Sequence, residues 1–237
     1  DGASFKREGD DLLVQGLNQQ VLSSTVAPDG SVYFTLWGPR GGLDSLWRLT
    51  DPRPASADAM SVKTVLSKGL ADQSLDECVA FLDHPDRRVR SAAQFELVAR
   101  KEIKTLRALA IDEKAQLFPR LHSLWGLGQL KHRDKQLLAA LCASDDAEIR
   151  AQAARWAGDL FFDPDKLMPR LLEDPSARVQ LFAGITCGKL KSPGALGALV
   201  SLLVAADNQI PVLRHAGVSG LVGVATPDEL QGFSTHP

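Results

Sequence analysis

A row of polar, mostly basic positions is the part of this sequence whose residue types and spacing could do chemistry. Each follows an apolar residue near the start of a helical pattern. The positions are Arg90, His122, Arg150, Gln180 and Arg214. Acidic residues stand in the preceding turns, so stacked turns would bring cations and carboxylates into a ladder of charge-assisted hydrogen bonds. The alternative is that Arg87, Arg90, His122, Arg150 and Arg214 bind a protein partner.

Catalytic and metal chemistry find no support in the sequence. The five histidines show neither HExxH nor HxxxH spacing and have no nearby cysteine, so no metal site is predicted. No GxSxG elbow occurs, and the pattern favours a structural role for His122 because it gives this residue no orienting partner. The cysteines, Cys78, Cys142 and Cys187, stand alone in apolar helical contexts without any CxxC or CxxCH. We therefore expect no catalytic residue, no metal ligand and no cofactor-binding residue.

The composition is that of a globular protein. The chain has 237 residues, of which 44% are hydrophobic and 24% charged, and its net charge is −2. This balance does not predict a nucleic-acid partner. No apolar run reaches the roughly 18–20 residues that a membrane-spanning helix needs. A protein is the expected partner.

The first fifty residues have the pattern of a small antiparallel sheet. Short β-rich segments occur at 4–6, 12–15, 21–26, 31–37 and 46–49, and turns such as Pro28-Asp29-Gly30 separate them. We expect four short strands among these five segments of residues 1–50, which would make about one blade of a β-propeller. Residues 51–73 are polar and proline-bearing, which predicts a linker, and within it 61–69 fits either a short strand or a helix.

Residues 74–225 repeat a helix pair about every 30 residues, so we expect a mainly α protein built as an α-solenoid of five pairs. The copies align on Val89, Leu121, Ile149, Val179 and Leu213. The expected first helices are 75–82, 102–110, 135–142, 166–172 and 195–205. The expected second helices are 88–100, 117–130, 148–160, 178–190 and 212–224.

Small residues four positions after these anchors predict close helix packing. In order, the positions hold Ala93, Trp125, Ala153, Ala183 and Gly217. We expect Trp125 to fill space that the other repeats close by contact, which would make the second repeat the widest; the alternative is that it stacks on a ligand. After the repeats, Thr226 and Pro227 begin a further helix in 226–237, which predicts that the chain is a piece of a longer protein.

The helical part resembles HEAT repeats in its turn motif, Asp-Pro-x-x-x-Val-Arg-x-x-Ala. A closer resemblance combines both halves of the chain. Residues 2–6, 27–34, 41–42 and 46–49 look like the end of a sugar-dehydrogenase-like β-propeller, and residues 84–95 and 121–130 look like the HEAT region that follows it. This order is similar to that of the PVC-type membrane-bound dehydrogenases.

The resemblance implies an exported, periplasmic oxidoreductase in which a propeller acts on a sugar or alcohol and a c-type cytochrome module passes electrons on. This chain would hold at most one blade and has no CxxCH, so haem c would belong to the rest of such a protein. The expected role is a non-catalytic connector that positions the propeller relative to the cytochrome module. The alternative is a free-standing HEAT-repeat adaptor or a HEAT-like lyase-type protein.

Overall fold

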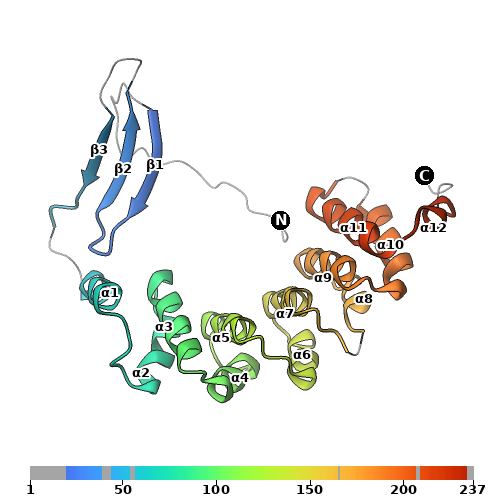
Figure 1. The fold of residues 1–237 in the computed structure, drawn as a ribbon, viewed down its shortest axis with the longest axis horizontal. Coiled ribbons are helices and arrows are strands. Elements are labelled where there is room, and N and C mark those ends of the chain that lie inside the picture. The colour runs from blue at the N-terminus through green and yellow to red at the C-terminus, as the bar shows by residue number, and fades with distance from the viewer. Residues whose placement is uncertain (1–19, 39–43, 54–56, 165, 207–208, 234–237) are drawn as a thin grey trace. The chain divides into compact units, whose positions relative to one another are not determined.

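The protein is mainly helical and carries one small antiparallel sheet, as the sequence predicts (Figure 1). The computed structural model describes residues 20–38, 44–53, 57–164, 166–206 and 209–233. The chain divides into two compact units, one within residues 7–96 and the other from residue 97 onward. In the described ranges no helix is long and apolar enough to span a membrane.

Three strands form the sheet of the first unit, in the order β1 (Gln20–Val26), β2 (Val32–Trp37) and β3 (Ser45–Leu49). The Pro-Asp-Gly turn joins β1 to β2, and Gly30 supplies its left-handed residue at φ 83°. Phe34 and Leu36 are buried on one side of β2, whereas every residue of β1 is exposed. The expected strands at 4–6 and 12–15 lie outside the described residues.

A helix, α1 (Ala57–Lys68), occupies much of the segment expected to be a linker. This finding decides between the two interpretations of 61–69 in favour of a helix. Val62 and Val65 are buried one turn apart on this helix, so it has a packed side despite its polar sequence. The first helical pair follows as α2 (Leu75–Ala80), a 3-10 turn (Phe81–Asp83) and α3 (Arg87–Ala99). The boundary between the two compact units falls within α3.

The second unit stacks helix pairs, each in contact with the next. The pairs are α4 (Ile103–Ile111) with α5 (Leu117–Gln129), α6 (Lys135–Cys142) with α7 (Ala147–Leu160), α8 (Met168–Leu171) with α9 (Ala177–Leu190), and α10 (Leu196–Ala206) with α11 (Pro211–Val224). A 3-10 turn, Pro193–Ala195, leads into α10. The second helices α5, α7, α9 and α11 pack side by side in chain order, which is the arrangement of an α-solenoid (Figure 1). The short α12 (Pro227–Gln231) begins at Thr226 with a capping box.

Left-handed residues after the second helices give the true period of the repeat. Lys101, Lys131, Phe161 and Lys191 have φ of 50–58° and stand 30 residues apart. On this period the buried small position holds Ala93, Ser123, Ala153 and Ala183, all fully buried. The sequence alignment of the second repeat on Leu121 was therefore two residues out of register.

Trp125 belongs to a different column of side chains from the one expected. It is equivalent to Arg155 and Ile185, and its side chain is 37% exposed. The expectation that Trp125 fills internal space is wrong, because its position on α5 is exposed to solvent. Ser123 takes the close-packed position instead.

Candidate functional site

Two arginines, the buried Arg90 and the half-buried Arg150, close the turns between the helices of a pair. Arg90 Nη1 donates to the carbonyl oxygens of His84 and Pro85 at 2.7 and 2.8 Å. Arg150 Nη1 makes the equivalent bonds, to the carbonyls of Ser144 at 2.8 Å and Asp145 at 3.1 Å. Each arginine therefore satisfies carbonyl groups five and six residues before it, which the turn leaves without helical partners.

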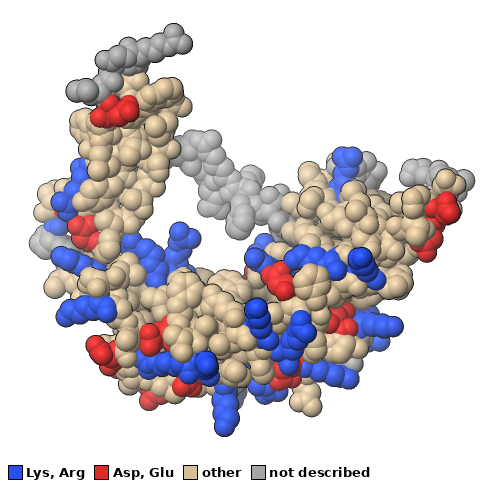
Figure 2. Space-filling view, viewed as in Figure 1, with Lys and Arg blue, Asp and Glu red and all other residues tan. Residues whose placement is uncertain are grey.

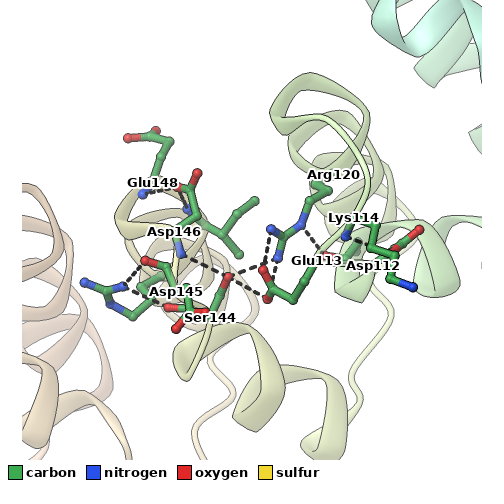
Figure 3. A network of polar contacts seen from close by, with 11 residues as sticks. Asp112, Glu113, Lys114, Arg120, Ser144, Asp145, Asp146 and Glu148 are labelled. Atoms are coloured by element: carbon green, nitrogen blue, oxygen red, sulfur yellow. Dashed lines mark hydrogen bonds and ion pairs between the residues drawn. The ribbon is translucent and has the colours of Figure 1, made fainter.

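The same column also links one turn to the next (Figure 3). Arg120 Nη2 donates to Ser144 Oγ at 3.0 Å, and Arg150 Nε and Nη2 donate to the Asp174 carboxylate at 2.8 and 3.0 Å. Both links span 24 residues. Arg120 is also bound by Glu113 in two hydrogen bonds of 2.8 and 2.9 Å. We call Arg120, Arg150, Ser144, Asp174 and Glu113 the turn ladder.

Hydrogen bonds from the neighbouring arginines favour the ionised form of the two carboxylates in the turn ladder. Burial would raise the pKa of Asp174, yet the hydrogen bonds from Arg150 and from the Ser176 N–H outweigh it, so this pKa lies below its ordinary value of 3.8. Hydrogen bonds from Arg120 and Ser144 likewise lower the pKa of Glu113. Arg120 and Arg150 are therefore each paired with a carboxylate of this chain, Glu113 and Asp174 respectively.

The predicted residues Arg87, Arg90, His122, Arg150 and Arg214 do not share one role. Arg90 and Arg150 are internal turn arginines, and His122 is 5% exposed with its ring edge-on to Trp125 at 4.9 Å between centroids. Arg214 is exposed on α11. Arg87 is exposed at the start of α3, beside a cavity of about 650 Å³ that residues of β1 also line. The sequence alignment placed His122 in the same column as Arg90 and Arg150, whereas the 30-residue period puts Arg120 in that column.

A second network of hydrogen bonds and ion pairs lies on the solvent-exposed side of α5, α7 and α9. The sequence did not predict it. Trp125 Nε1 donates to Gln152 Oε1 at 3.0 Å, and Gln152 Nε2 donates to Glu148 Oε1 at 2.8 Å. Glu148 also pairs with Arg178 of α9. These bonds connect three successive second helices.

Side chains farther along α7 and α9 extend this network of polar contacts. Asp159 accepts from Lys189 Nζ at 2.7 Å and lies 3.5 Å from Arg155 Nε, while the guanidinium groups of Arg155 and Arg178 approach the Phe182 ring at 6.0 and 5.2 Å from its centroid. Figure 2 shows basic side chains gathered around acidic ones over α7 and α9. We call this surface the second-helix face, with Trp125, Arg155, Asp159, Arg178, Ile185 and Lys189 as its exposed or half-exposed members.

A pocket of about 490 Å³ opens on the second-helix face between α5 and α7. Its walls include Trp125, Gly128, Arg155 and Trp156. A Cβ added to Gly128 would lie 3.2 Å from Trp156 Cδ1, so glycine lets the indole pack against α5. Trp156 is 5% exposed, and its Nε1 has no hydrogen-bond acceptor in the described part of the chain.

The described residues give no support to a metal centre or to an activated thiol. Within them no group of three or more His, Cys, Asp and Glu residues is placed to hold a metal ion. Burial raises the pKa of Cys142 and of Cys187 to about 12, with a smaller contribution from Asp163, so neither thiol is an activated nucleophile. Comparison with known proteins finds no family model and no curated protein that matches the chain.

Proposed function

We propose that this chain is a non-catalytic scaffold that binds a protein partner through the second-helix face. The observation that carries the proposal is the column Trp125, Arg155 and Ile185, which repeats every 30 residues on α5, α7 and α9 and leaves each side chain at least partly accessible. Tryptophan and arginine are the residue types most enriched at the energetic centres of protein interfaces.

The electrostatics of the second-helix face also favour a protein partner. Glu148 with Arg178 and Asp159 with Lys189 are already paired across helices, so the face presents both signs of charge in fixed positions. Such a surface selects a partner by complementarity of individual groups. A polyanion would instead require an excess of unpaired cations, which a chain of net charge −2 does not supply.

The larger context that we propose is a connector within an exported, periplasmic dehydrogenase, placed between a β-propeller and a module that binds haem c. The HEAT-like and blade-like motifs support this assignment, as do the apolar side chains that β1, β2 and β3 leave exposed, among them Val21, Trp37, Leu46 and Trp47. Neighbouring blades would cover such a surface. The second candidate, a free-standing HEAT-type adaptor, is favoured by the second-helix face alone.

A site-specific crosslinking experiment tests the scaffold. A photoreactive amino acid replaces Ile185 on the second-helix face, and the matched control carries it at Arg170, an exposed residue of α8. In the native host, position 185 should crosslink to one defined protein, or to another part of a longer form of this chain, and position 170 should not. The same crosslinking pattern from both positions would contradict the proposal.

The connector role has its own tests. The coding sequence on either side of this chain should contain further blade motifs before it and a CxxCH after it. The purified chain should show no Soret absorption and should reduce no electron-accepting dye with any aldose. A complete reading frame without these modules would favour the free-standing adaptor.

A further inference from the structure

We propose that the pocket between α5 and α7 receives an acidic side chain and an adjoining apolar residue from an extended peptide segment of the partner. This inference rests on the proposed scaffold function and names the chemistry of what the second-helix face binds. We call the site the α5–α7 pocket, and Trp125, Gly128, Lys131, Gln152, Arg155 and Trp156 are the lining residues that the argument uses.

The apolar part of the α5–α7 pocket comes from two tryptophans on neighbouring helices. Trp125 stands at the mouth with its side chain 37% exposed, and its Nε1 bond to Gln152 fixes the indole in place. Trp156 forms a buried wall against Gly128. The volume of about 490 Å³ far exceeds the roughly 30 Å³ that one water occupies, so the pocket has room for a side chain. A fixed indole loses little conformational entropy when an apolar residue packs against it.

The charged part of the α5–α7 pocket is cationic. Arg155 and Lys131 line it, and both are exposed. Asp159 also lines the pocket, but its carboxylate accepts from Lys189 at 2.7 Å, so Lys189 already compensates its charge. Arg155 makes no side-chain hydrogen bond within the described ranges, and its one ion pair, to Asp159, is long at 3.5 Å. Its guanidinium can therefore donate to an incoming carboxylate in a charge-assisted bond.

The wall of the α5–α7 pocket holds a donor that needs an acceptor. Trp156 Nε1 is buried, and no acceptor lies within hydrogen-bond distance of it among the described residues. Buried polar groups without partners are rare in folded proteins. A carbonyl oxygen of a peptide segment could accept from this N–H only after the indole turns toward the pocket, because Nε1 has less than 1 Å² of accessible surface.

An extended segment fits the second-helix face better than a compact ligand. On α9, the half-buried Phe182 and Ile185 follow the pocket residues Gln152 and Arg155 at the repeat spacing of 30 residues. A chain that places its acidic residue at Arg155 can continue along these positions. Successive side chains of the segment would then meet successive repeats.

Peptide selection provides the test. A display library of random 12-residue peptides is panned on the immobilised full chain, and selected peptides are labelled for fluorescence anisotropy. We expect enrichment of Asp or Glu within two positions of an aromatic or aliphatic residue. Binding should weaken at least about tenfold for Arg155→Glu and for Trp125→Ala, weaken less for Arg155→Lys, and fall with rising salt. Arg170→Glu makes the same charge change on α8 and should leave binding unchanged.

Two kinds of result would overturn the inference. Selected peptides without acidic residues, or no selected peptide at all, would show that the α5–α7 pocket does not receive this chemistry. Equal losses in Arg155→Glu and Arg170→Glu would indicate general charge attraction. Circular dichroism of each variant shows whether it folds. If Arg155→Glu does not fold, Arg155→Gln replaces it, and if Trp125→Ala does not fold, Trp125→Leu replaces it. The crosslinking result at Ile185 is independent of the peptides, so the scaffold can stand while the pocket fails.

Discussion

The contact between α7 and α9 at Gly158 leads to a quantitative prediction about stability. A Cβ added to Gly158 would lie 2.4 Å from Thr186 Oγ1 and 3.2 Å from Thr186 Cβ. Thr186 is 2% exposed, and its hydroxyl donates to the Ala154 carbonyl at 2.8 Å. Gly158→Ala must therefore push two packed helices apart or displace a buried hydroxyl from its acceptor.

The expected magnitude follows from three opposing contributions. Overpacking costs about 1–3 kcal/mol, and the displaced hydrogen bond costs about 1 kcal/mol more. Alanine returns about 1 kcal/mol because glycine is the poorer helix former. We expect Gly158→Ala to lower the free energy of unfolding by about 1–3 kcal/mol. Gly197→Ala is the matched control, since nothing lies within 4 Å of its added Cβ, and it should raise stability by about 0.5 kcal/mol.

Urea unfolding followed by circular dichroism measures both effects. A double variant, Gly158→Ala with Thr186→Ala, removes the oxygen that the new methyl group meets. Its loss should be smaller than the sum of the two single losses by about 1–2 kcal/mol, because the two residues are in contact. Additive losses, or a Gly158→Ala protein as stable as the parent, would refute the close approach of α7 to α9.

Three further predictions concern the helix contacts, the turn ladder and the sheet. Ala153→Leu should cost about 1–3 kcal/mol by overpacking a fully buried position, whereas Ala140→Leu at an exposed position of α6 should cost almost nothing; equal melting temperatures would place Ala153 outside the helix contact. Arg150→Ala should cost about 3 kcal/mol at neutral pH. Because the pKa of Asp174 in the folded chain lies below its ordinary value of 3.8, this difference should shrink as the pH falls below about 4, and a difference constant with pH would contradict the pairing. The full chain should self-associate in sedimentation velocity through the exposed apolar residues of the sheet, and a chain without residues 1–56 should remain monomeric; a monomeric full chain at high concentration would count against the blade-like interpretation.

The sequence predicts the helical pairs well because their apolar positions recur strongly. The expected second helix 148–160 is α7, Ala147–Leu160, and the expected first helix 135–142 is α6, with the same bounds. The start of the last helix at Thr226 is also confirmed, because a threonine followed by proline and acids satisfies the free N–H groups of a first turn. The sequence does not distinguish a helix from a strand at α1, because the apolar side of this segment is short.

The register of the second repeat could not be predicted from hydrophobicity. Leucines crowd α5, so Leu121 looks like an anchor, whereas the structure gives that place to Pro119. The left-handed positions that mark the period are occupied by Lys101, Lys131, Phe161 and Lys191, and none is the glycine that usually signals such a position. The two-residue error hid Arg120 in the turn ladder and hid the exposed column to which Trp125 belongs.

The constant period of 30 residues makes the solenoid modular in chain length. Removal of residues 132–161 would join Lys131 to Phe162 and keep every later residue in phase with its column, because one left-handed position replaces another. The shortened protein would keep Arg90 and Arg120 at the turn position, with Gln180 at the equivalent position of α9, and the small residues Ala93, Ser123 and Ala183 would stay in their buried column. A deletion of 28 or 32 residues would instead rotate the following helices by about half a turn, since each residue advances an α-helix by about 100°. The repeat length thus defines the step in which this chain can be lengthened or shortened.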